Sequence, residues 1–582
     1  MNHEFCPRNI NELWATIIVQ EFLRWGVTHW FVSPGYRGAP LVAVIAAYHQ
    51  ITTISCPDER AAAFQALGYS RLTGFPSGLL CTSGTAGANY YPAVIEASRD
   101  QVPLVVLTAD RPMKAIRTGA NQVMVQSRLF GGFVKDELSL PDPGCAFDAA
   151  ALAAHVGALV QASRQFPRGP VHLNMPLQEP LEPVEDAKRT ILNCERDEAR
   201  SVTDLRRIGP MAIASEPPVL SAGAADLVRK ALSDSDRPLL VVGRLPPDQD
   251  TDLVAEMVAR SGLPTILDIS SGCRQGDAAN PWLSPALPGA AAILREYAPD
   301  LVLHLGKTLV AKQLDQYLGK EFAGTYIIAG QDTGPFDSLL RCDLKLVCGE
   351  ATIGRLLAEF RPKGSADSFV LAASRMLSLK RELLNAIADS PFGFPGLAVA
   401  IWQNTRSGRN LFLGNSMTVR AFDCFAFGAS EVRRVIMQRG VSGIEGHIAN
   451  GLGIAATGDP VTVVCGDIAV MHDLNSMIPL SQSKRDLIVV VANNHGGGIF
   501  RHLPIGRYPE VHEPLITTPH QLNFEGLCRW LGIEYAAVNT TRSFTEVYSA
   551  FQEKGGVAVI ECNFDDNIEA DLMGRLNAIK GA

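Results

Sequence analysis

The chain has 582 residues, a length that predicts three or four domains. Its composition, 47% hydrophobic and 19% charged, is typical of a globular protein with large cores, and the formal net charge of −8 argues against general binding to nucleic acid or anionic membranes. The 12 cysteines have no metal-ligand spacing, the N-terminus has no secretory signal and no apolar run is long enough to cross a bilayer, so we expect a soluble cytoplasmic protein with reduced thiols.

Short apolar runs alternate with helical patterns from the N-terminus onward and predict a first α/β domain at residues 1–185. The strands predicted in it are 30–33, 51–55, 78–82, 103–108 and 171–174. Alanine-rich stretches predict helices at 60–70 and 149–165. A polar, charge-mixed segment follows, and we expect residues 186–215 to be a linker.

The same alternation continues in two further blocks, which predict a middle domain at 216–365 and a third domain at 366–582. The strands predicted in the middle block are 238–243, 264–269, 301–305 and 325–329. Those predicted in the third block are 411–414, 461–466, 487–492 and 557–562. Strands that alternate with helices at these lengths form parallel sheets, so the expected fold class is α/β, with three doubly wound parallel-sheet domains in series.

An acidic pair, Asp58-Glu59, closes the second predicted strand and opens a helix. Acidic residues at a helix start often only cap it and complement its dipole. The stretch 81–89 (CTSGTAGAN), however, ends the next strand in small residues, where a flat ring can approach the backbone closely. A Glu facing such a slot would have its pKa raised by burial and would keep its proton available, so Glu59 is a candidate for acid–base chemistry.

Arginines lie near four predicted strand ends, at Arg37, Arg111, Arg420 and Arg439. A lone surface Arg is usually solvated or ion-paired at little net value. Four of them at the carboxyl edges of parallel sheets lie where open α/β sheets bind ligands. Because the guanidinium fork matches a carboxylate through two hydrogen bonds, the pattern predicts substrates with several carboxylates.

Two short polar segments follow successive apolar runs in the third block: Gly466-Asp467-Ile468 and Asn493-Asn494-His495-Gly496-Gly497. Each segment alone is ordinary turn chemistry. Because both end parallel strands, the Asp and the Asn are expected at one edge of the sheet. One carboxylate, one amide oxygen and backbone carbonyls suit Mg²⁺ that carries a diphosphate. The pair looks like the metal–diphosphate site of thiamine-diphosphate (ThDP) enzymes.

Over essentially its whole length the chain resembles the 2-succinyl-5-enolpyruvyl-6-hydroxy-3-cyclohexene-1-carboxylate (SEPHCHC) synthase family, or MenD family, of ThDP enzymes. The motifs that carry the likeness are SPGYRGAPL at 33–41, DER at 58–60, TSGTA at 82–86, NYYPA at 89–93, LTADRP at 107–112, GANQ at 119–122, GNS at 414–416, RGVSGI at 439–444 and the segment 466–497 with its DLN at 473–475. Most ThDP enzymes have a third Gly where this chain has Ile468, a change that the family tolerates. The resemblance implies that the three domains are pyrimidine-binding, middle and diphosphate-binding domains.

The resemblance implies a reaction of menaquinone and phylloquinone biosynthesis. In it, 2-oxoglutarate loses CO₂ and the remaining succinic-semialdehyde carbanion equivalent adds in a 1,4 sense to isochorismate. The implied cofactors are ThDP and Mg²⁺, with Mn²⁺ as an alternative. In this family the cofactor lies between the first domain of one subunit and the third domain of its partner. A homodimer or a dimer of dimers is therefore expected, with Glu59 and Asp467 of one site on different chains.

The resemblance also implies roles for single residues. Glu59 would be catalytic, hydrogen-bonded to the aminopyrimidine ring so that the ring's amine can remove the thiazolium C2 proton. The metal ligands would be Asp467, Asn494 and the Gly496 carbonyl. Further cofactor contacts would be Asn415, Ile444, Gly466, Ile468, Ile499 and Phe500. The substrate residues would be Arg37, Arg111, Asn121, Gln122, Lys312, Ser416, Arg420 and Arg439. Of these, Ser416 and Arg420 match positions that hold the donor's distal carboxylate.

Three positions depart from the family pattern, all among the substrate residues: Tyr36 replaces a small Ser, Gln313 the second member of a basic pair and Gln438 an Asn. Loss of one cation would cost about 1.5–3 kcal/mol of carboxylate binding. A divergent ThDP-dependent 2-oxoglutarate carboligase or decarboxylase with a different acceptor is therefore a second hypothesis.

Two more hypotheses are a catalytically silent paralogue that acts as a binding partner and an acetolactate-synthase-like enzyme with a bound flavin. The presence of Glu59, Asp467 and Asn494 argues against the silent paralogue. The acid-binding arginines argue against the flavin enzyme.

Overall fold

The computed structural model describes residues 7–144, 148–184, 218–246, 250–274, 280–332, 337–359, 366–564 and 566–579. The chain divides into two compact units. The first unit contains Met1–Ser215 with Arg439–Ser442 and Ala449–Thr457, and the second contains the remainder. The predicted linker 186–215 lies outside the described residues.

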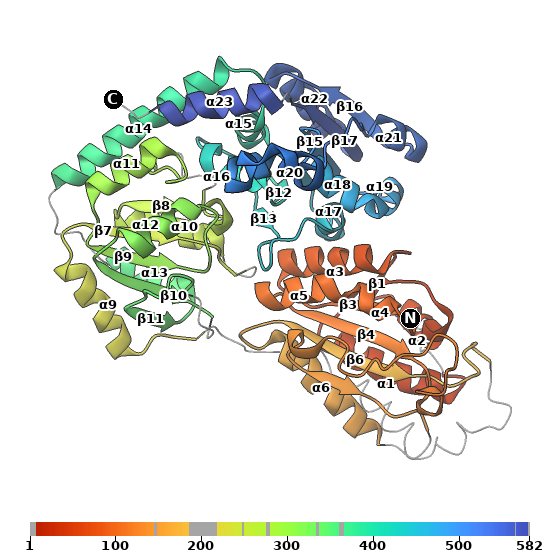
Figure 1. The fold of residues 1–582 in the computed structure, drawn as a ribbon. Coiled ribbons are helices and arrows are strands. Elements are labelled where there is room, and N and C mark those ends of the chain that lie inside the picture. The colour runs from red at the N-terminus through yellow and green to blue at the C-terminus, as the bar shows by residue number, and fades with distance from the viewer. Residues whose placement is uncertain are drawn as a thin grey trace. The chain divides into compact units, whose positions relative to one another are not determined.

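The first unit contains a six-stranded parallel sheet in the order β2-β1-β3-β4-β6-β5, of which Figure 1 labels β1, β3, β4 and β6. Its strands are β1 (His29–Val32), β2 (Thr52–Ser55), β3 (Ser77–Cys81), β4 (Leu104–Asp110), β5 (Glu137–Ser139) and β6 (Pro170–Pro176). Its helices are α1 (Ile10–Arg24), α2 (Ala39–Ala47), α3 (Glu59–Thr73), α4 (Ala86–Asn89), α5 (Tyr91–Asp100) and α6 (Ala149–Arg164), with short 3₁₀ turns η1 (Tyr36–Gly38), η2 (Met113–Ala115) and η3 (Gly131–Phe133).

Helices cover both faces of this sheet. Since successive side chains of a strand point to opposite faces, each strand packs against helices on both sides. In β4, Val105 and Leu107 belong to a cluster formed with α1, α2 and α6, whereas Leu104 and Val106 belong to one formed with α3 and α5. All four side chains are fully buried. This two-sided burial explains why the strands are continuous apolar runs in the sequence.

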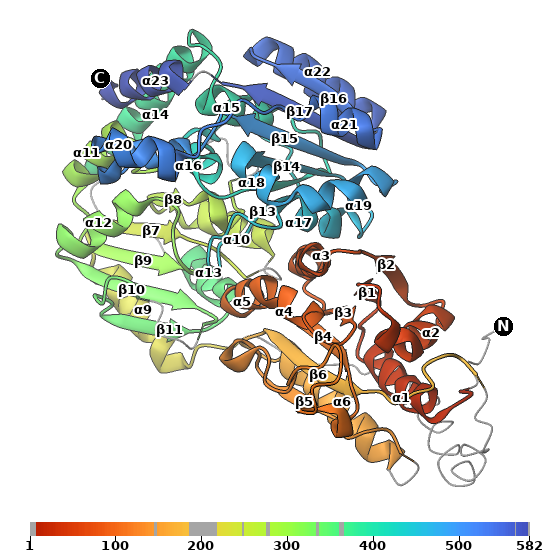
Figure 2. The same cartoon turned by 45° about the vertical axis from the view of Figure 1, so that its right-hand side comes forward.

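The second unit begins with a five-stranded parallel sheet in the order β11-β10-β9-β7-β8, whose neighbouring strands run side by side in Figure 2. Its strands are β7 (Pro238–Val242), β8 (Thr265–Leu267), β9 (Leu301–Leu305), β10 (Thr325–Gly330) and β11 (Leu344–Val347). Its helices are α9 (Ala222–Asp234), α10 (Thr251–Ser261), η4 (Ile269–Ser271), α11 (Pro288–Tyr297), α12 (Lys312–Lys320) and α13 (Glu350–Glu359). We refer to the described residues that build this sheet and its helices, between 218 and 359, as the middle domain.

The second unit ends with a six-stranded parallel sheet in the order β13-β12-β14-β15-β17-β16. Its strands are β12 (Asn410–Leu413), β13 (Val435–Met437), β14 (Val461–Gly466), β15 (Leu487–Asn493), β16 (Glu534–Val538) and β17 (Val557–Asn563). Its longer helices are α14 (Ala366–Ala388), α15 (Phe394–Asn404), α16 (Met417–Phe425), α17 (His447–Ala455), α22 (Thr541–Lys554) and α23 (Asp566–Ala578). The shorter ones are α18 (Asp467–His472), η5 (Leu474–Ser476), α19 (Met477–Gln482), η6 (Gly498–His502), η7 (Pro504–Arg507), α20 (Pro509–His512), η8 (Glu513–Thr517) and α21 (Glu525–Leu531).

The predicted fold class, α/β with three parallel sheets, is confirmed. Each predicted strand is present, with its ends shifted by at most two residues. The sequence patterns missed β5, β11, β13 and β16, and each of these is an edge strand. Among the described helices, none combines the length and the apolar character needed to span a membrane.

Candidate active site

Asp467 lies at the carboxyl edge of the third sheet, against the loop that follows the neighbouring strand. The parallel register pairs Gly466 of β14 with Ala492 of β15, so the residues after them emerge side by side. The buried Asp467 carboxylate accepts hydrogen bonds from the backbone N–H of Ile468 at 2.6 Å and from that of Gly496 at 2.9 Å. The structure thus brings together the two segments that the sequence analysis paired.

The loop at 494–497 depends on glycine. Gly496 has φ +149°, and a Cβ there would lie 2.8 Å from the Thr517 carbonyl oxygen. The Gly496 carbonyl accepts a hydrogen bond from the Gly498 N–H at 3.0 Å, and its oxygen has a second lone pair. Asn494, the first residue of this loop, is buried. A larger residue at Gly496 would push the loop away from Asp467.

These residues fit a magnesium ion bound to a diphosphate. The described residues contain no group of three or more His, Cys, Asp or Glu side chains that could hold a metal, so a metal at this edge would take the mixed set of carboxylate, amide and carbonyl oxygens. Among the described residues, nothing lies within 4 Å of a Cβ built on Gly466, which leaves room beside Asp467. Burial raises the pKa of Asp467, while the two N–H donors and His520 oppose the rise.

His520 is a neighbour of Asp467 that sequence reasoning missed. Its Nε2 lies 3.2 Å from Asp467 Oδ2, and the ring is mostly buried. The residue comes from the loop after η8, far from β14 in the sequence and without a motif around it. No local signal marks such a residue.

Asn415 holds both ends of the loop at 438–443, next to Ile444. Its side-chain amide donates to the Gln438 carbonyl at 2.8 Å and to the Gly443 carbonyl at 2.6 Å. Gln438 is fully buried, and its amide donates to the carbonyls of Gly443 and Glu445 at 3.4 and 3.3 Å. Gln438, one of the three departures from the family pattern, therefore supports this loop from within.

The candidate donor-binding pair, Ser416 and Arg420, lies on the first turn of α16. Arg420 Nη1 donates to the Ser416 carbonyl at 2.7 Å, and Arg420 is exposed. Ser416 has φ +68°, a left-handed conformation that is uncommon for a residue other than glycine and that recurs at functional sites. Lys312, the first residue of α12, is also exposed in this unit, as is Gln313.

Glu59 begins α3 in the first unit, directly after the N-cap. Asp58 caps the helix by accepting from the Ala61 N–H at 2.8 Å, which leaves Glu59 outside the capping role and half-buried. Burial raises the pKa of the Cys81 thiol and of the Tyr90 hydroxyl, and the nearby charge of Glu59 adds to both. Thr82 Oγ1 is buried and has no hydrogen-bond partner within the described ranges.

The candidate acid-binding arginines of the first unit differ in their environment. Arg37 is buried and donates to the Leu177 carbonyl at 3.0 Å and to the Glu179 carboxylate at 3.2 Å. Arg111 is half-buried, and its Nε has no acceptor in the part of the chain that the structure describes. Tyr36 is exposed and donates its hydroxyl hydrogen to Glu182.

The loop that carries Asn121 and Gln122 is held by a residue that sequence reasoning missed, Gln126. Asn121 and Gln122 are exposed, and Gln122 Nε2 donates to the Ser83 carbonyl at 3.0 Å. Gln126 is buried; its amide donates to Asn174 Oδ1 at 3.0 Å, and its oxygen accepts from the Gly84 N–H at 2.9 Å. The loop is thereby joined to β6 and to the small-residue turn after β3.

Arg439 is half-buried and belongs to the segment Arg439–Ser442 of the first unit. Glu96 of α5, fully buried, accepts from the N–H groups of Gly440 and Val441, both at 2.7 Å. Arg71 donates to the same carboxylate at 3.1 Å. Burial raises the pKa of Glu96, although Arg71 and the two N–H groups oppose the rise.

The remaining candidate cofactor contacts belong to the second unit. Ile444, Ile468, Ile499 and Phe500 are half-buried, and the last two belong to η6, which follows the Gly496 loop. Glu59, Arg37, Arg111, Asn121, Gln122 and Arg439 lie in the first unit, and the other candidate site residues lie in the second.

Comparison with known families finds two matching family models. "Thiamine pyrophosphate enzyme, N-terminal TPP binding domain" matches residues 14–129, and "Thiamine pyrophosphate enzyme, C-terminal TPP binding domain" matches residues 417–562. The first match contains Glu59 and Arg111, and the second contains Arg420, Asp467 and Asn494.

Curated relatives match almost the whole chain. A 2-succinyl-5-enolpyruvyl-6-hydroxy-3-cyclohexene-1-carboxylate synthase of Chlorobaculum parvum is 34% identical over 98% of this chain and 96% of its own length. Synthases of the same name from Chlorobaculum tepidum and Syntrophus aciditrophicus are each 35% identical, over 96% and 97% of this chain and 95% and 97% of their own lengths.

Proposed function

We propose that the chain, which belongs to the SEPHCHC synthase family of ThDP-dependent enzymes, catalyses that family's reaction in menaquinone biosynthesis. In this reaction 2-oxoglutarate is decarboxylated and its remaining four-carbon part is added to isochorismate. The observation that carries the proposal is the contact between Asp467 and the Gly496 loop, since it brings a carboxylate beside a loop with amide and carbonyl oxygens that could hold a metal at a diphosphate.

The chain's own residues would hold the cofactors. When bound, ThDP supplies a nucleophilic carbon for attack on a keto group and an electron sink for the loss of CO₂. Asp467, Asn494 and the Gly496 carbonyl would hold Mg²⁺ at the diphosphate, since all three offer the hard oxygen ligands that this ion prefers. The Glu59 carboxyl group would form a hydrogen bond to the pyrimidine ring.

Donor binding is assigned to the first turn of α16. Arg420 would pair with the distal carboxylate of 2-oxoglutarate through two hydrogen bonds, and the Ser416 hydroxyl would donate a third. The C1–C2 bond of the donor breaks as CO₂ leaves. A bond then forms between the donor's C2 and the ring carbon β to the isochorismate carboxylate, and the α carbon takes up a proton.

Acceptor binding is assigned to Arg37, Arg111, Asn121, Gln122, Lys312 and Arg439. The buried Nε of Arg111 supports this assignment: it has no acceptor among the described residues, and a buried donor without an acceptor is costly until a ligand provides one. The Gln438 side chain bonds to the backbone of its own loop. The replacement of the family's Asn by Gln at this position therefore affects how the loop is supported. Tyr36 and Gln313 are the departures at exposed positions.

The assembly proposed with this function is a homodimer, or a dimer of dimers, in which Glu59 of one chain completes the site around Asp467 of its partner. We also propose a cytoplasmic location, since the described cysteines are free thiols. The proposed domains are 1–185, 216–365 and 366–582, and each of the three sheets falls inside one of them.

The experiment that tests the proposal uses the purified chain with 2-oxoglutarate, isochorismate, ThDP and Mg²⁺. The expected result is consumption of isochorismate and formation of a product with the mass of SEPHCHC, both lost when ThDP or the metal is omitted. Release of CO₂ without loss of isochorismate would contradict the assigned acceptor and favour the divergent carboligase or decarboxylase.

A further inference from the structure

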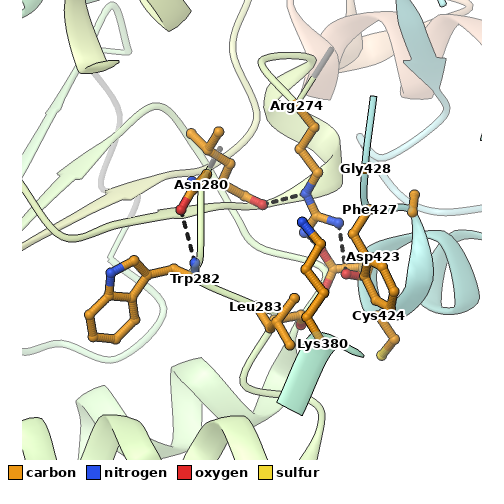
Figure 3. A pocket seen from close by; sticks show the side chains of 12 residues that line it. Arg274, Asn280, Trp282, Leu283, Lys380, Asp423, Cys424, Phe427 and Gly428 are labelled. Carbon is orange, nitrogen blue, oxygen red and sulfur yellow. Dashed lines mark hydrogen bonds and ion pairs between the residues drawn. The ribbon is translucent and has the colours of Figure 1, made fainter. Parts of the chain in front are cut away.

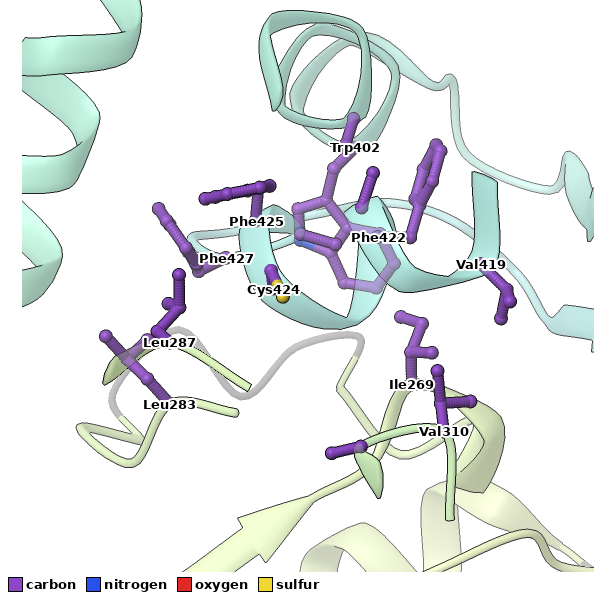
Figure 4. Close-up of a cluster of buried hydrophobic side chains, with 14 of the residues drawn as sticks. Ile269, Leu283, Leu287, Val310, Trp402, Val419, Phe422, Cys424, Phe425 and Phe427 are labelled. Carbon is purple, nitrogen blue, oxygen red and sulfur yellow. The ribbon is translucent and has the colours of Figure 1, made fainter. Parts of the chain in front are cut away.

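Helix α16 carries the proposed donor-binding residues at its start, and it packs against η4 of the middle domain as well as against α15. Val419, Phe422 and Phe425 are buried in a cluster that includes Ile269 and Val310 of the middle domain. Figure 4 shows Val419 and Phe422 facing Ile269 and Val310. The helix direction is therefore set partly by a domain that is built on a different sheet.

Asp423, in the last turn of α16, is the polar anchor of this contact. It is buried, and its Oδ1 accepts from the Ile269 N–H at 3.0 Å and from Arg274 Nη2 at 2.7 Å. Its Oδ2 accepts from the Ser284 hydroxyl at 2.5 Å. All three donors belong to the middle domain, and Figure 3 shows Arg274 and Asp423 directed toward each other.

Arg274 also closes the C-terminal end of α16. Its Nη1 donates to the carbonyls of Asp423 at 2.8 Å and Phe422 at 3.3 Å, and its Nε donates to the Leu267 carbonyl at the end of β8 at 2.6 Å. A cation at this end satisfies helix carbonyls and complements the helix dipole. The guanidinium fork thus fixes the helix end on β8 in more than one direction.

Asp268, directly after β8, fixes a second element that leads to a substrate residue. It is buried, and its Oδ2 accepts from the Val310 N–H at 2.7 Å. Val310 stands two residues before Lys312, where α12 begins. The adjacent residues Asp268 and Ile269 therefore hold both the segment that precedes Lys312 and the helix that carries Arg420.

We propose that Asp423, with Arg274 and Asp268, is a positioning centre that fixes α16, and with it the placement of Ser416 and Arg420, and so determines how tightly the donor's distal carboxylate is bound. This inference rests on the proposed function. Burial and the neighbouring Asp268 charge raise the pKa of Asp423 to about 6, so its ionised form costs stability at neutral pH. The carboxylate's contribution is the geometry that it imposes on α16.

The test compares two substitutions of Asp423 by steady-state kinetics. Asp423→Ala removes three acceptor bonds, and we expect KM for 2-oxoglutarate to rise about tenfold while kcat falls by less than about threefold. Asp423→Asn keeps an oxygen for Ile269 and Arg274, and it is expected to remain within about twofold of the wild-type KM. ThDP affinity, measured separately, is expected to be unchanged in both.

A matched control separates positioning from loss of stability. Tyr548→Phe removes a buried hydroxyl that bonds to Thr405 at 3.0 Å and Thr462 at 2.9 Å in the same domain, and the donor KM is expected to stay at the wild-type value. If Asp423→Ala does not fold, Ser284→Ala removes one of the three bonds and should raise the donor KM about twofold to threefold.

A double-mutant cycle with Arg420→Ala completes the test. If Asp423 acts through Arg420, Asp423→Ala has no further effect on the donor KM in the Arg420→Ala background. Two outcomes would overturn this inference and leave the proposed function standing. One is additive effects of the two substitutions, and the other is an unchanged donor KM in Asp423→Ala and Ser284→Ala beside an active wild type. A wild type that does not consume 2-oxoglutarate would overturn the proposed function and this inference with it.

Discussion

Replacing Asp423 by Asn is expected to raise the stability of the chain at neutral pH. Asp423 lies in the last turn of α16, where its carboxylate accepts from Ile269, Arg274 and Ser284 while facing the charge of Asp268. Asn keeps one acceptor oxygen and places a donor amide toward the Ser284 hydroxyl, which can also accept. The substitution therefore removes the charge and retains most of the bonding.

The magnitude follows from the pKa of Asp423, which burial and Asp268 raise from 3.8 to about 6. Since one pKa unit is worth about 1.4 kcal/mol, ionisation of this group in the folded chain costs about 3 kcal/mol. For an acid whose folded pKa is raised, the stability is fully present below pH 3.8 and is lost as the pH rises from there to about 6. The Asp423→Asn variant has no such loss, so its gain over the wild type is greatest above pH 6.

Urea unfolding of the wild type and of Asp423→Asn between about pH 4 and pH 8 measures this effect. We expect the midpoint of the transition that includes the second unit to be similar at the acidic end and higher in the variant at the basic end. Asp486→Asn is the matched control, because its carboxylate accepts from Arg409 at 2.6 Å and its loss should lower stability by about 1 kcal/mol. An Asp423→Asn variant that is less stable by the same amount at every pH would refute the reasoning.

Three further substitutions test the proposed roles in the site. Glu59→Gln is expected to lower kcat by about a thousandfold while ThDP still binds, as measured by equilibrium titration; a variant as fast as the wild type would contradict the role. Asp467→Ala should abolish the magnesium dependence of ThDP binding. A magnesium dependence equal to that of the wild type would place the metal elsewhere. Arg420→Ala should raise the donor KM by about 10- to 150-fold, equivalent to about 1.5–3 kcal/mol, with Arg420→Lys in between.

All interior strands were predictable from the sequence, whereas four of the six edge strands, β5, β11, β13 and β16, were not. A strand that is buried on both faces is a continuous apolar run and is therefore recognised easily. Val489 and Val490 of β15 are fully buried, and the strand is a continuous apolar run. In β16, all four residues from Glu534 to Ala537 are half-buried or exposed, and the strand includes a charged residue and has no clear period. The same holds for β5, at an edge of the first sheet, where Glu137 and Ser139 are polar.

The residues that bear chemistry were predictable where a strand end and a motif coincide, as at Asp467 and Glu59. The residues that hold them in place were not. Glu96, Gln126 and Asp423 lie within or beside helices and loops whose patterns are ordinary, and their partners are distant in the sequence. Their buried side-chain bonds are visible only once the chain is folded.

The proposed active site combines Glu59 of one chain with Asp467 of another. Mixing two inactive variants, Glu59→Gln and Asp467→Ala, under conditions that exchange subunits tests it directly. In a mixed dimer one site carries both substitutions and the other carries neither, so isochorismate consumption should recover to about a quarter of the wild-type rate. A mixture that remains as inactive as each variant alone would contradict the claim.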